Sequence, residues 1–341
     1  MTSNSGHVRE WRRRDVLGAM SAAGAAALLG LRSTPAQAEP PPETTSIRIN
    51  DAPIACFAPL YVARELLKLE GFKDIQYVNV PLAAGPSTAL ARGEVDFIMD
   101  DPPAHVLAVN GGSQVVLLNG MHTGCWELFG SNEVRSLHDL KGKKIAAPAN
   151  SSRVAFVAAM LVAVGLNPDK DVIWIDHEPG VSMKLFIEGK VDAFMGFAPE
   201  PQELRARGIG HVLVDTLTDR PWSQYFCCML GGRREFVSRY PVATRRAVRA
   251  FIKAAELCVS DPEAAAQIVV KAGVSEKYEY VLKAVREIGY RNWRIYEPED
   301  TVRFWALRLR EAGMISASPK KIIDEHCDWR FSNELKRELK A

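Results

Sequence analysis

The chain has 341 residues, of which 43 are basic and 41 are acidic, and its formal net charge at pH 7 is +2. Such an even balance disfavours a nucleic-acid or anionic-membrane partner, because either would select an excess of basic residues. The length exceeds the roughly 250–300 residues at which a single hydrophobic core stops growing, so it predicts two domains.

Residues 1–38 have the pattern of an export signal. The stretch Arg13-Arg14-Asp15-Val16-Leu17 comes first, a weakly apolar run rich in Ala and Gly continues to residue 31, and the small-residue site Ala36-Gln37-Ala38 follows. The run is shorter than the roughly 20 apolar residues that span a bilayer. We therefore predict a secretory signal of the twin-arginine type, cleaved near Ala38. The mature protein would carry 38 basic and 39 acidic residues, and we expect it to be soluble in the periplasm.

The first half of the mature chain alternates strand and helix patterns. Apolar runs indicate strands, and Pro, Ser and Gly residues at their ends indicate where helices start and stop. The expected strands are 46–49, 75–80, 95–99 and 115–118, and the expected helices begin at Pro59, Ser87 and Ala104. Strands and helices in alternation predict a parallel sheet that helices cover on both faces.

The second half repeats the first at a constant offset. The phrase RGEVDFIMDDPPAHV at 92–106 recurs as EGKVDAFMGFAPEPQ at 188–202, ninety-six positions later, so that Asp96 matches Asp192. Because Gly, Val, Asp, Met and Pro keep one register, the repeat predicts a second α/β lobe. The strands expected in it are 144–147, 172–175, 191–195 and 211–214, and the helices are 154–164, 182–189 and 201–206.

Two extended segments, 124–129 and 224–230, lead out of these halves. We predict two doubly wound α/β lobes, with lobe one formed by 45–124 plus 226–341 and lobe two by 125–225. Two lobes that are joined by two extended crossings can close around a ligand. Helices are expected after the second crossing at 241–259, 262–272, 278–288, 298–312 and from 319 onward.

The six cysteines show neither a CxxC pairing nor a regular framework. A chain of this size does not need disulfides, so we expect buried free thiols. A twin-arginine substrate folds before export, which would bury such thiols before they meet an oxidant. Cys227 and Cys228 are adjacent in an expected strand, and their side chains should point to opposite faces and not share a metal ion. No metal site and no cofactor is expected.

The order and spacing of four motifs resemble a known family. They are Ala58-Pro59-Leu60-Tyr61-Val62-Ala63, the stretch 91–96, the stretch 137–145 and Gly189-Lys190-Val191-Asp192-Ala193. With these, the chain resembles the periplasmic solute-binding proteins of ABC importers, in the type II group labelled nitrate, sulfonate, taurine or bicarbonate binding and related to thiamine-pyrimidine-precursor binders. The resemblance covers about residues 46–330. It implies a monomer with a ligand cleft between its lobes, which delivers a solute to a membrane permease and its ATPase.

In open α/β sheets, ligands bind beyond the carboxyl ends of the strands. Asp96 and Asp192 begin their strands, so we expect them to hold turns instead. Serines at helix starts are expected to cap the helices and can also receive anions. The expected ligand-binding residues are Cys56, Phe57, Ser87, Asp101, His122, Ser151, Ser152, Arg153, Glu178, Glu200, Trp222 and Gln224.

Acidic residues outnumber basic ones at these strand ends. A carboxylate beside a bound inorganic anion is costly unless it is protonated or paired. We therefore expect a polar organic solute with hydrogen-bond donors rather than a simple oxyanion, its anionic end held by Arg153 and the helix starts.

We expect no enzymatic activity. Gly180-Val181-Ser182-Met183-Lys184 lacks the second glycine of a nucleophile elbow, and HExxH, Walker A and GxGxxG motifs are absent from the sequence. Two other functions remain open. One is a sensory module that presents its ligand to a membrane receptor. The other is an enzyme like the yeast thiamine-pyrimidine synthase, whose cysteine-rich run is similar to Cys227-Cys228 but longer.

Overall fold

The computed structural model describes residues 39–52, 54–80, 85–149, 151–177, 179–275 and 277–339. The predicted export signal, 1–38, lies outside the described residues. Residues 41–341 form one unit, to which everything below refers. Within the part of the chain that is described, no helix combines the length and the hydrophobicity needed to cross a membrane.

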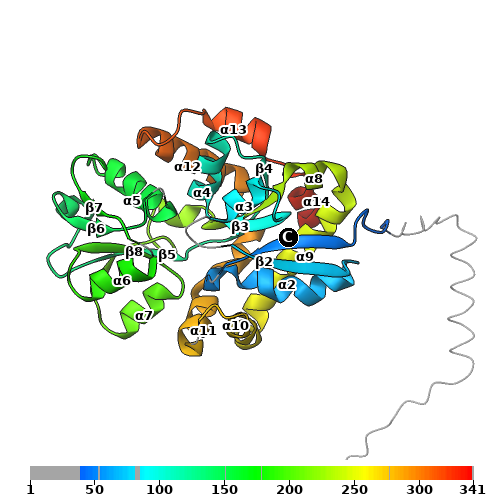
Figure 1. Ribbon diagram of the computed structural model, residues 1–341, viewed down its shortest axis with the longest axis horizontal. Helices are drawn as coiled ribbons and strands as arrows, with labels where there is room; N and C mark the ends of the chain where they lie inside the picture. The colour runs from blue at the N-terminus through cyan, green and yellow to red at the C-terminus, as the bar shows by residue number, and fades with distance from the viewer. Residues whose placement is uncertain are drawn as a thin grey trace, which may run out of the picture. The chain divides into compact units, whose positions relative to one another are not determined.

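The first sheet is built mainly from the first half of the mature chain. Its strand order is β2-β1-β3-β10-β4, and β10 runs antiparallel to β3 and β4 while β1 runs parallel to β2 and β3. Helices α2 (Ala58–Leu69), α3 (Pro86–Ala91) and α4 (Pro102–Asn110) belong to this lobe (Figure 1). The strands are β1 (Ser46–Asp51), β2 (Asp74–Asn79), β3 (Phe97–Asp100), β4 (Val115–His122) and β10 (Cys228–Arg233).

The second sheet repeats this order strand for strand. Its order is β7-β6-β8-β5-β9, and β5 is the antiparallel strand between β8 and β9. Helices α5 (Ser152–Ala163), α6 (Pro179–Ile187) and α7 (Glu200–Ala206) accompany it. The strands are β5 (Trp126–Gly130), β6 (Lys144–Ala146), β7 (Ile173–Ile175), β8 (Ala193–Phe197) and β9 (His211–Asp215).

Two α/β lobes are therefore confirmed, but the expected all-parallel sheets are wrong. Each extended crossing continues as a strand of the lobe that it enters: β5 inserts into the second sheet and β10 into the first. The crossing chain arrives from the opposite direction and fills the gap between two parallel strands, so its hydrogen bonds are antiparallel. The residue bounds of the two lobes remain a prediction. The placement of β5 in the second sheet and of β10 in the first sheet supports it.

Helices dominate the chain after β10. The long helix α9 (Pro241–Ser260) packs against α2, and α12 (Pro298–Glu311) contacts both α4 and α5 (Figure 1). Glu297 is the N-cap residue of α12, and Glu299 and Asp300 lie in its first turn, where acidic side chains stabilise a helix start. The remaining helices are α8 (Arg234–Arg239), α10 (Pro262–Lys271), α11 (Tyr278–Glu287), α13 (Pro319–His326) and α14 (Arg330–Glu338), with 3-10 turns η1 (Ala55–Phe57), η2 (Leu137–Leu140), η3 (Trp222–Gln224) and η4 (Tyr290–Arg294).

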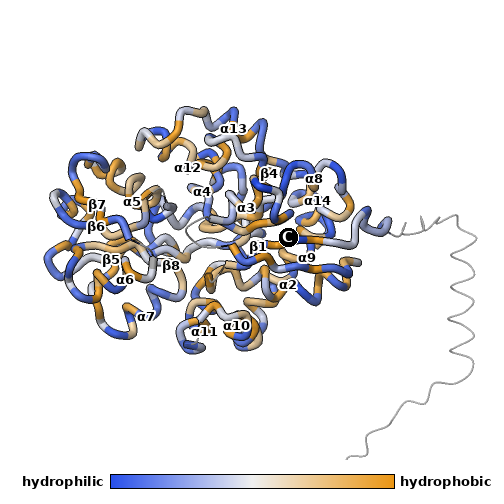
Figure 2. Tube along the Cα trace, in the orientation of Figure 1, coloured by the Kyte–Doolittle hydropathy of each residue, from blue (hydrophilic) through white to orange (hydrophobic). Residues whose placement is uncertain are grey.

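Hydrophobic residues concentrate along the strands, and hydrophobic and hydrophilic residues alternate along the helices (Figure 2). Every residue of β3, β4, β5 and β8 is buried, which accounts for their continuous hydrophobic patterns. Aromatic rings continue the core from one lobe to the other. Phe156 of α5 packs between Trp126 and Trp305, with ring centroids 4.9 Å and 4.6 Å away.

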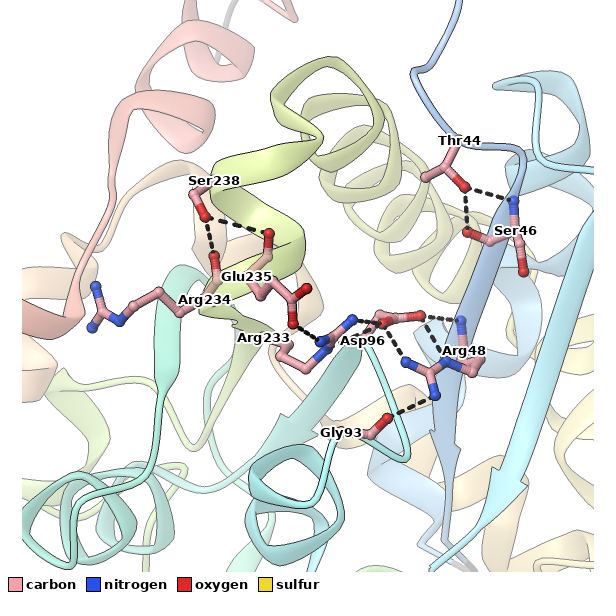
Figure 3. A network of polar contacts seen from close by, with 9 residues as sticks. All are labelled: Thr44, Ser46, Arg48, Gly93, Asp96, Arg233, Arg234, Glu235 and Ser238. Atoms are coloured by element: carbon pink, nitrogen blue, oxygen red, sulfur yellow. Dashed lines mark hydrogen bonds and ion pairs between the residues drawn. The ribbon is translucent and has the colours of Figure 1, made fainter.

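The repeated aspartates hold equivalent turns in both lobes. The Asp96 carboxylate accepts a hydrogen bond from the backbone N–H of Arg48 at 3.0 Å, and Asp192 accepts one from Lys144 at 2.7 Å. Asp96 also pairs with the guanidinium groups of Arg48 and Arg233, at 2.8 and 3.0 Å (Figure 3). The expectation that these two carboxylates anchor the helix-to-strand turn is confirmed.

Candidate functional site

A cavity of about 430 Å³ lies between the two lobes, beyond the carboxyl ends of their strands. Lobe one contributes the segment after β1, the start of α3 and the residues that follow β3. Lobe two contributes Trp126, Pro148, Ala149, the start of α5, Asp176 after β7 and Phe197 at the end of β8. Seven of the expected residues line this cavity: Cys56, Phe57, Ser87, Asp101, Ser151, Ser152 and Arg153.

Four of the other expected residues lie elsewhere, and Glu178 lies outside the described residues. Trp222 packs against Trp305, with ring centroids 5.7 Å apart, and Gln224 is exposed to solvent. Glu200 lies behind Arg153, and His122 lies behind the thiols that line the cavity. Trp222 and Gln224 follow a strand of lobe two, but the chain there turns toward α12 instead of the cavity.

Arg153 lies in the wall of the cavity with its charge already compensated. Its side chain is 2% exposed, and its Nη2 donates to both carboxylate oxygens of Glu200, at 3.0 and 2.9 Å. Nη1 donates to the carbonyl oxygen of Met195, and the rings of Phe194 and Phe197 lie 4.8 and 4.6 Å from the guanidinium carbon. Burial raises the pKa of Glu200, although Arg153 opposes the shift. A buried guanidinium needs such a partner, so this pair first stabilises the second lobe.

Two consecutive carboxyl groups, Asp100 and Asp101, line the opposite wall. Asp101 is the N-cap residue of α4 and accepts a hydrogen bond from Ala104 N at 2.9 Å. Burial raises the pKa of Asp101 to about 7, and a hydrogen bond from Ser152 opposes that shift. Burial and the charge of Asp101 raise the pKa of Asp100. Both shifts favour the protonated carboxylic acid, the form that can donate a hydrogen bond to a ligand.

The serines of the cavity differ from simple helix caps. Gly85 is the N-cap residue of α3, so the expected cap at Ser87 is wrong, and the Ser87 hydroxyl lies 3.3 Å from the Asp100 carboxylate. Ser151 does occupy the N-cap position of α5, yet its buried hydroxyl has no hydrogen-bond partner among the described residues. Ser152 reaches across from lobe two to Asp101. These hydroxyls can contact a bound molecule.

A cluster of thiols forms one side of the cavity. Cys56, Cys125 and Cys228 line it, and one ligand atom of each lies within 4.8 Å of the others and of a ring nitrogen of His122. Burial would raise the pKa of the Cys56 thiol, but the polar neighbours Cys125, Cys228 and His122 hold that pKa well below its usual range. We name Cys56, His122, Cys125 and Cys228 the thiol–imidazole cluster.

Cys227 contradicts the expectation from strand geometry. Its Sγ lies 2.7 Å from that of Cys125, which also interacts with Cys228, so both adjacent thiols reach the same neighbour. Cys227 precedes β10, and the register of β10 against β4 shifts just after Cys228. Side chains alternate only in a regular strand, and this irregular start lets the two converge.

His122 is buried without a satisfied ring. It is 0% exposed, and neither of its ring nitrogens makes a hydrogen bond of acceptable geometry to any described residue. The ring of Tyr290 packs against it edge-on, with centroids 5.3 Å apart. An unsatisfied buried polar group costs about 1–3 kcal/mol, which calls for a reason to keep it there.

Three further residues of the site are absent from the expected set. Asp100, Trp126 and Asp176 also line the cavity, and each lies at a strand end or in a crossing. Nothing in the spacing of the cysteines indicated that they meet, because their segments lie far apart in the sequence.

Comparisons with known proteins agree with this architecture. A family model described as the NMT1-like family matches residues 40–272. A protein of Brucella abortus (strain 2308) that carries the name of a binding protein is 26% identical over 215 residues, which cover 63% of this chain. The chain spans 65% of the length of that relative.

Two solved structures share the fold at low sequence identity. The periplasmic nitrate-binding protein NrtA of Synechocystis PCC 6803 matches with a TM-score of 0.73 and 16% identity, over 88% of this chain and 90% of that one. The alkanesulfonate-binding protein SsuA of Xanthomonas axonopodis pv. citri, bound to MOPS, matches with a TM-score of 0.66 and 16% identity, over 81% of this chain and 96% of that one.

Proposed function

Since this chain belongs to the NMT1-like family, we propose that it is the extracytoplasmic solute-binding component of an ABC importer. The observation that carries the proposal is the cavity of about 430 Å³, to which both lobes contribute polar side chains. Clefts of this size between domains are typical sites for small molecules. In this role the protein is a monomer without catalytic activity, and its partners are a permease and an ATPase at the inner membrane.

Capture follows from how the two walls are connected. A solute that contacts Asp101 and Ser152 together binds best when the lobes are close, so it shifts the population toward the closed state. The crossings that lead into β5 and β10 are the segments about which the lobes would move. The solute is then enclosed until the permease favours the open state.

The chemistry of the walls favours a polar organic solute. Asp100, Asp101 and Asp176 line the cavity, and the charge of Arg153 is compensated by Glu200. A bare inorganic anion would face these carboxyl groups, whereas amino, ring N–H or hydroxyl groups can donate to them. Aromatic rings of Phe57, Trp126 and Phe197 provide apolar surface for the rest of the molecule.

A thermal-shift screen of small solutes, followed by calorimetry, tests this proposal. The panel sets nitrate, sulfate, bicarbonate and taurine beside aminopyrimidines and hydroxylated aromatic acids. A solute that binds only the folded state and is present at a hundred times its dissociation constant should add about 2.7 kcal/mol to the free energy of unfolding. If no solute and no extract of growth medium moves the melting temperature, the binding function is wrong.

Variants then test the site and the ligand class. Asp101→Asn and Ser152→Ala should each weaken binding of the organic solute about tenfold, the effect of one lost hydrogen bond to a charged group. Gln224→Ala is the matched control and should not change affinity, because Gln224 is exposed outside the cavity. Micromolar binding of an inorganic anion that Asp101→Asn leaves unchanged would overturn the ligand class but not the binding function.

Uptake of the identified solute separates import from sensing. A strain that lacks this protein should lose uptake, and a variant with Asp101→Asn should restore it only in part. Unchanged uptake in the deletion strain, with loss of a response to the solute, would instead support the sensory function.

A further inference from the structure

Three chain segments that lie far apart in the sequence meet at the thiol–imidazole cluster, and His122 and Cys125 come from the same one. Cys56 follows β1, His122 ends β4, Cys125 lies in the first crossing and Cys228 begins β10. One ligand atom from each lies within 4.8 Å of all the others. In a tetrahedral zinc site with Zn–S bonds of about 2.3 Å, neighbouring sulfur atoms are roughly 3.8 Å apart. Rotamer adjustments of about 1 Å would therefore bring these atoms to coordination distance of one ion.

His122 provides the second, independent observation. Its ring is fully buried beside the thiols, and neither nitrogen has a hydrogen-bond partner among the described residues. Neutral imidazole is the commonest metal ligand in proteins, and coordination would satisfy one of the two nitrogens. Packing against Tyr290 explains where the ring lies but not why a polar ring lies there.

We propose that Cys56, His122, Cys125 and Cys228 bind a single thiophilic metal ion, Zn²⁺ or Cu⁺, at the side of the interlobe cavity. Three sulfur atoms and one imidazole select soft or borderline cations and exclude Mg²⁺ and Ca²⁺, which require oxygen ligands. The thiols bind as thiolates and release their protons to solvent on loading. This proposal does not depend on the identity of the solute or on import.

Because of the position of the cluster, a bound ion would affect both the crossings between the lobes and the solute. Cys125 and Cys228 belong to the two connections between the lobes, and Cys56 belongs to lobe one beside α2. An ion held by all three would restrain the crossings against one lobe. Because the same three cysteines line the cavity, the ion would also face the bound solute. Tyr290 supports this arrangement from behind, since its hydroxyl donates to the Cys56 carbonyl oxygen at 3.2 Å.

The alternative chemistry of the cluster is a disulfide. Cys125 and Cys227 have sulfur atoms 2.7 Å apart, and joining them would need an oxidant and would remove one ligand from the cluster. A metal ion and this disulfide therefore exclude each other. Thiol counting distinguishes them, because six free thiols must be recovered from the denatured, metal-stripped protein if the ion is the resident group.

The experiment uses the full chain, purified without oxygen and with reductant, stripped by chelator and titrated with Zn²⁺, Co²⁺ or Cu⁺ alone. One equivalent of Zn²⁺ or Cu⁺ should survive dialysis and raise the melting temperature. Co²⁺ should give thiolate-to-metal charge-transfer bands together with the visible bands of tetrahedral coordination. Zn²⁺ and Cu⁺ are compared by chelator competition, and tight binding of either supports the site.

Substitutions assign the ligands. Cys56→Ser and His122→Ala should weaken binding at least tenfold, judged on protein whose circular dichroism shows that it is folded. Cys258→Ala is the matched control, because this thiol is buried but does not belong to the cluster, and the variant should keep one equivalent.

Three results would overturn the proposal. They are less than a tenth of an equivalent retained by the unmodified chain, a Co²⁺ spectrum without thiolate bands, and equal affinity in Cys56→Ser and Cys258→Ala. The first two use the unmodified protein, so they stand even if the variants fail to fold.

Discussion

His105 of α4 shows how burial alone changes the behaviour of a residue. Its ring is 0% exposed, and Nε2 lies 3.1 Å from the carbonyl oxygen of Met229. Burial lowers its pKa to about 4, and the hydrogen bond to Met229 opposes the shift only in part. The ring therefore stays neutral in the folded protein at pH values where a histidine in the unfolded chain takes up a proton.

The stability of the protein should consequently fall on acidification. Between the unfolded pKa of about 6.5 and the folded value of about 4, the unfolded state binds more protons, so the free energy of unfolding decreases as pH decreases. From pH 7 to pH 5 the loss through His105 should be about 2 kcal/mol. Denaturant titrations at the two pH values measure it.

Other groups titrate in the same pH range, so the contribution of His105 is measured by comparing a variant with the unmodified protein. His105→Gln, which can still donate to Met229, should lose about 2 kcal/mol less than the unmodified protein between the two pH values. His138→Gln changes an exposed histidine and should leave the difference unchanged. An equal loss in all three proteins would contradict the assignment.

At the scale of elements, the two repeated turns form a natural internal comparison. Asp96 is 4% exposed and neutralises two arginines from β1 and β10, whereas Asp192 is less buried and accepts the backbone N–H of Lys144. The turn of lobe one therefore ties three strands together through charge. The same sequence motif forms both turns, but how much its aspartate contributes to the free energy of unfolding depends on the residues around it.

We expect Asp96→Asn to destabilise the protein by about 3 kcal/mol, because it leaves the Arg48 guanidinium without its counter-charge and Arg233 with only the exposed Glu235. Asp192→Asn should cost about 1 kcal/mol, the usual value of one hydrogen bond to the backbone. Chemical denaturation of both variants side by side measures the difference. Equal losses would show that the arginines of lobe one contribute no more than a turn does.

At the scale of the whole molecule, the lobes are connected by packed aromatic rings as well as by backbone. Phe156 of α5 packs against Trp126 of β5 with a tilted ring and against Trp305 of α12 edge-on. Two polar contacts also join the lobes, from Gln202 and Arg205 of α7 to Glu287 of α11. A moving lobe must therefore slide on these contacts, and we expect closure to be a limited rotation about the crossings.

The proposed export route carries a prediction for the whole protein. Replacing Arg13 and Arg14 by lysines should leave unprocessed precursor in the cytoplasm, because the arginine pair is the recognition feature of this signal type. Cell fractionation and the size of the product measure the effect. Processed protein in the periplasm of the double variant would show that another route suffices.

The sequence by itself determined the elements, the repeat and its turns. Strand and helix periodicity is a local property, and the role of Asp96 could be predicted because its position at the start of a strand recurs in Asp192. The sequence also predicted a site at the strand ends, and Asp101, Ser152 and Arg153 line a cavity there. Each of these conclusions needs only short-range patterns or the general rule for α/β sheets.

Only the tertiary structure showed which residues of distant segments contact one another. The antiparallel insertion of β5 and β10, the pairing of Arg153 with Glu200 and the meeting of Cys56 with Cys228 all join residues that no local pattern relates. A strand can pair with any neighbouring strand that has free backbone groups, and side chains that are far apart in the sequence meet only when the chain is folded. The chemistry of the cavity therefore depends on long-range packing, while the lobes that form it can be predicted from the order of residues along the chain.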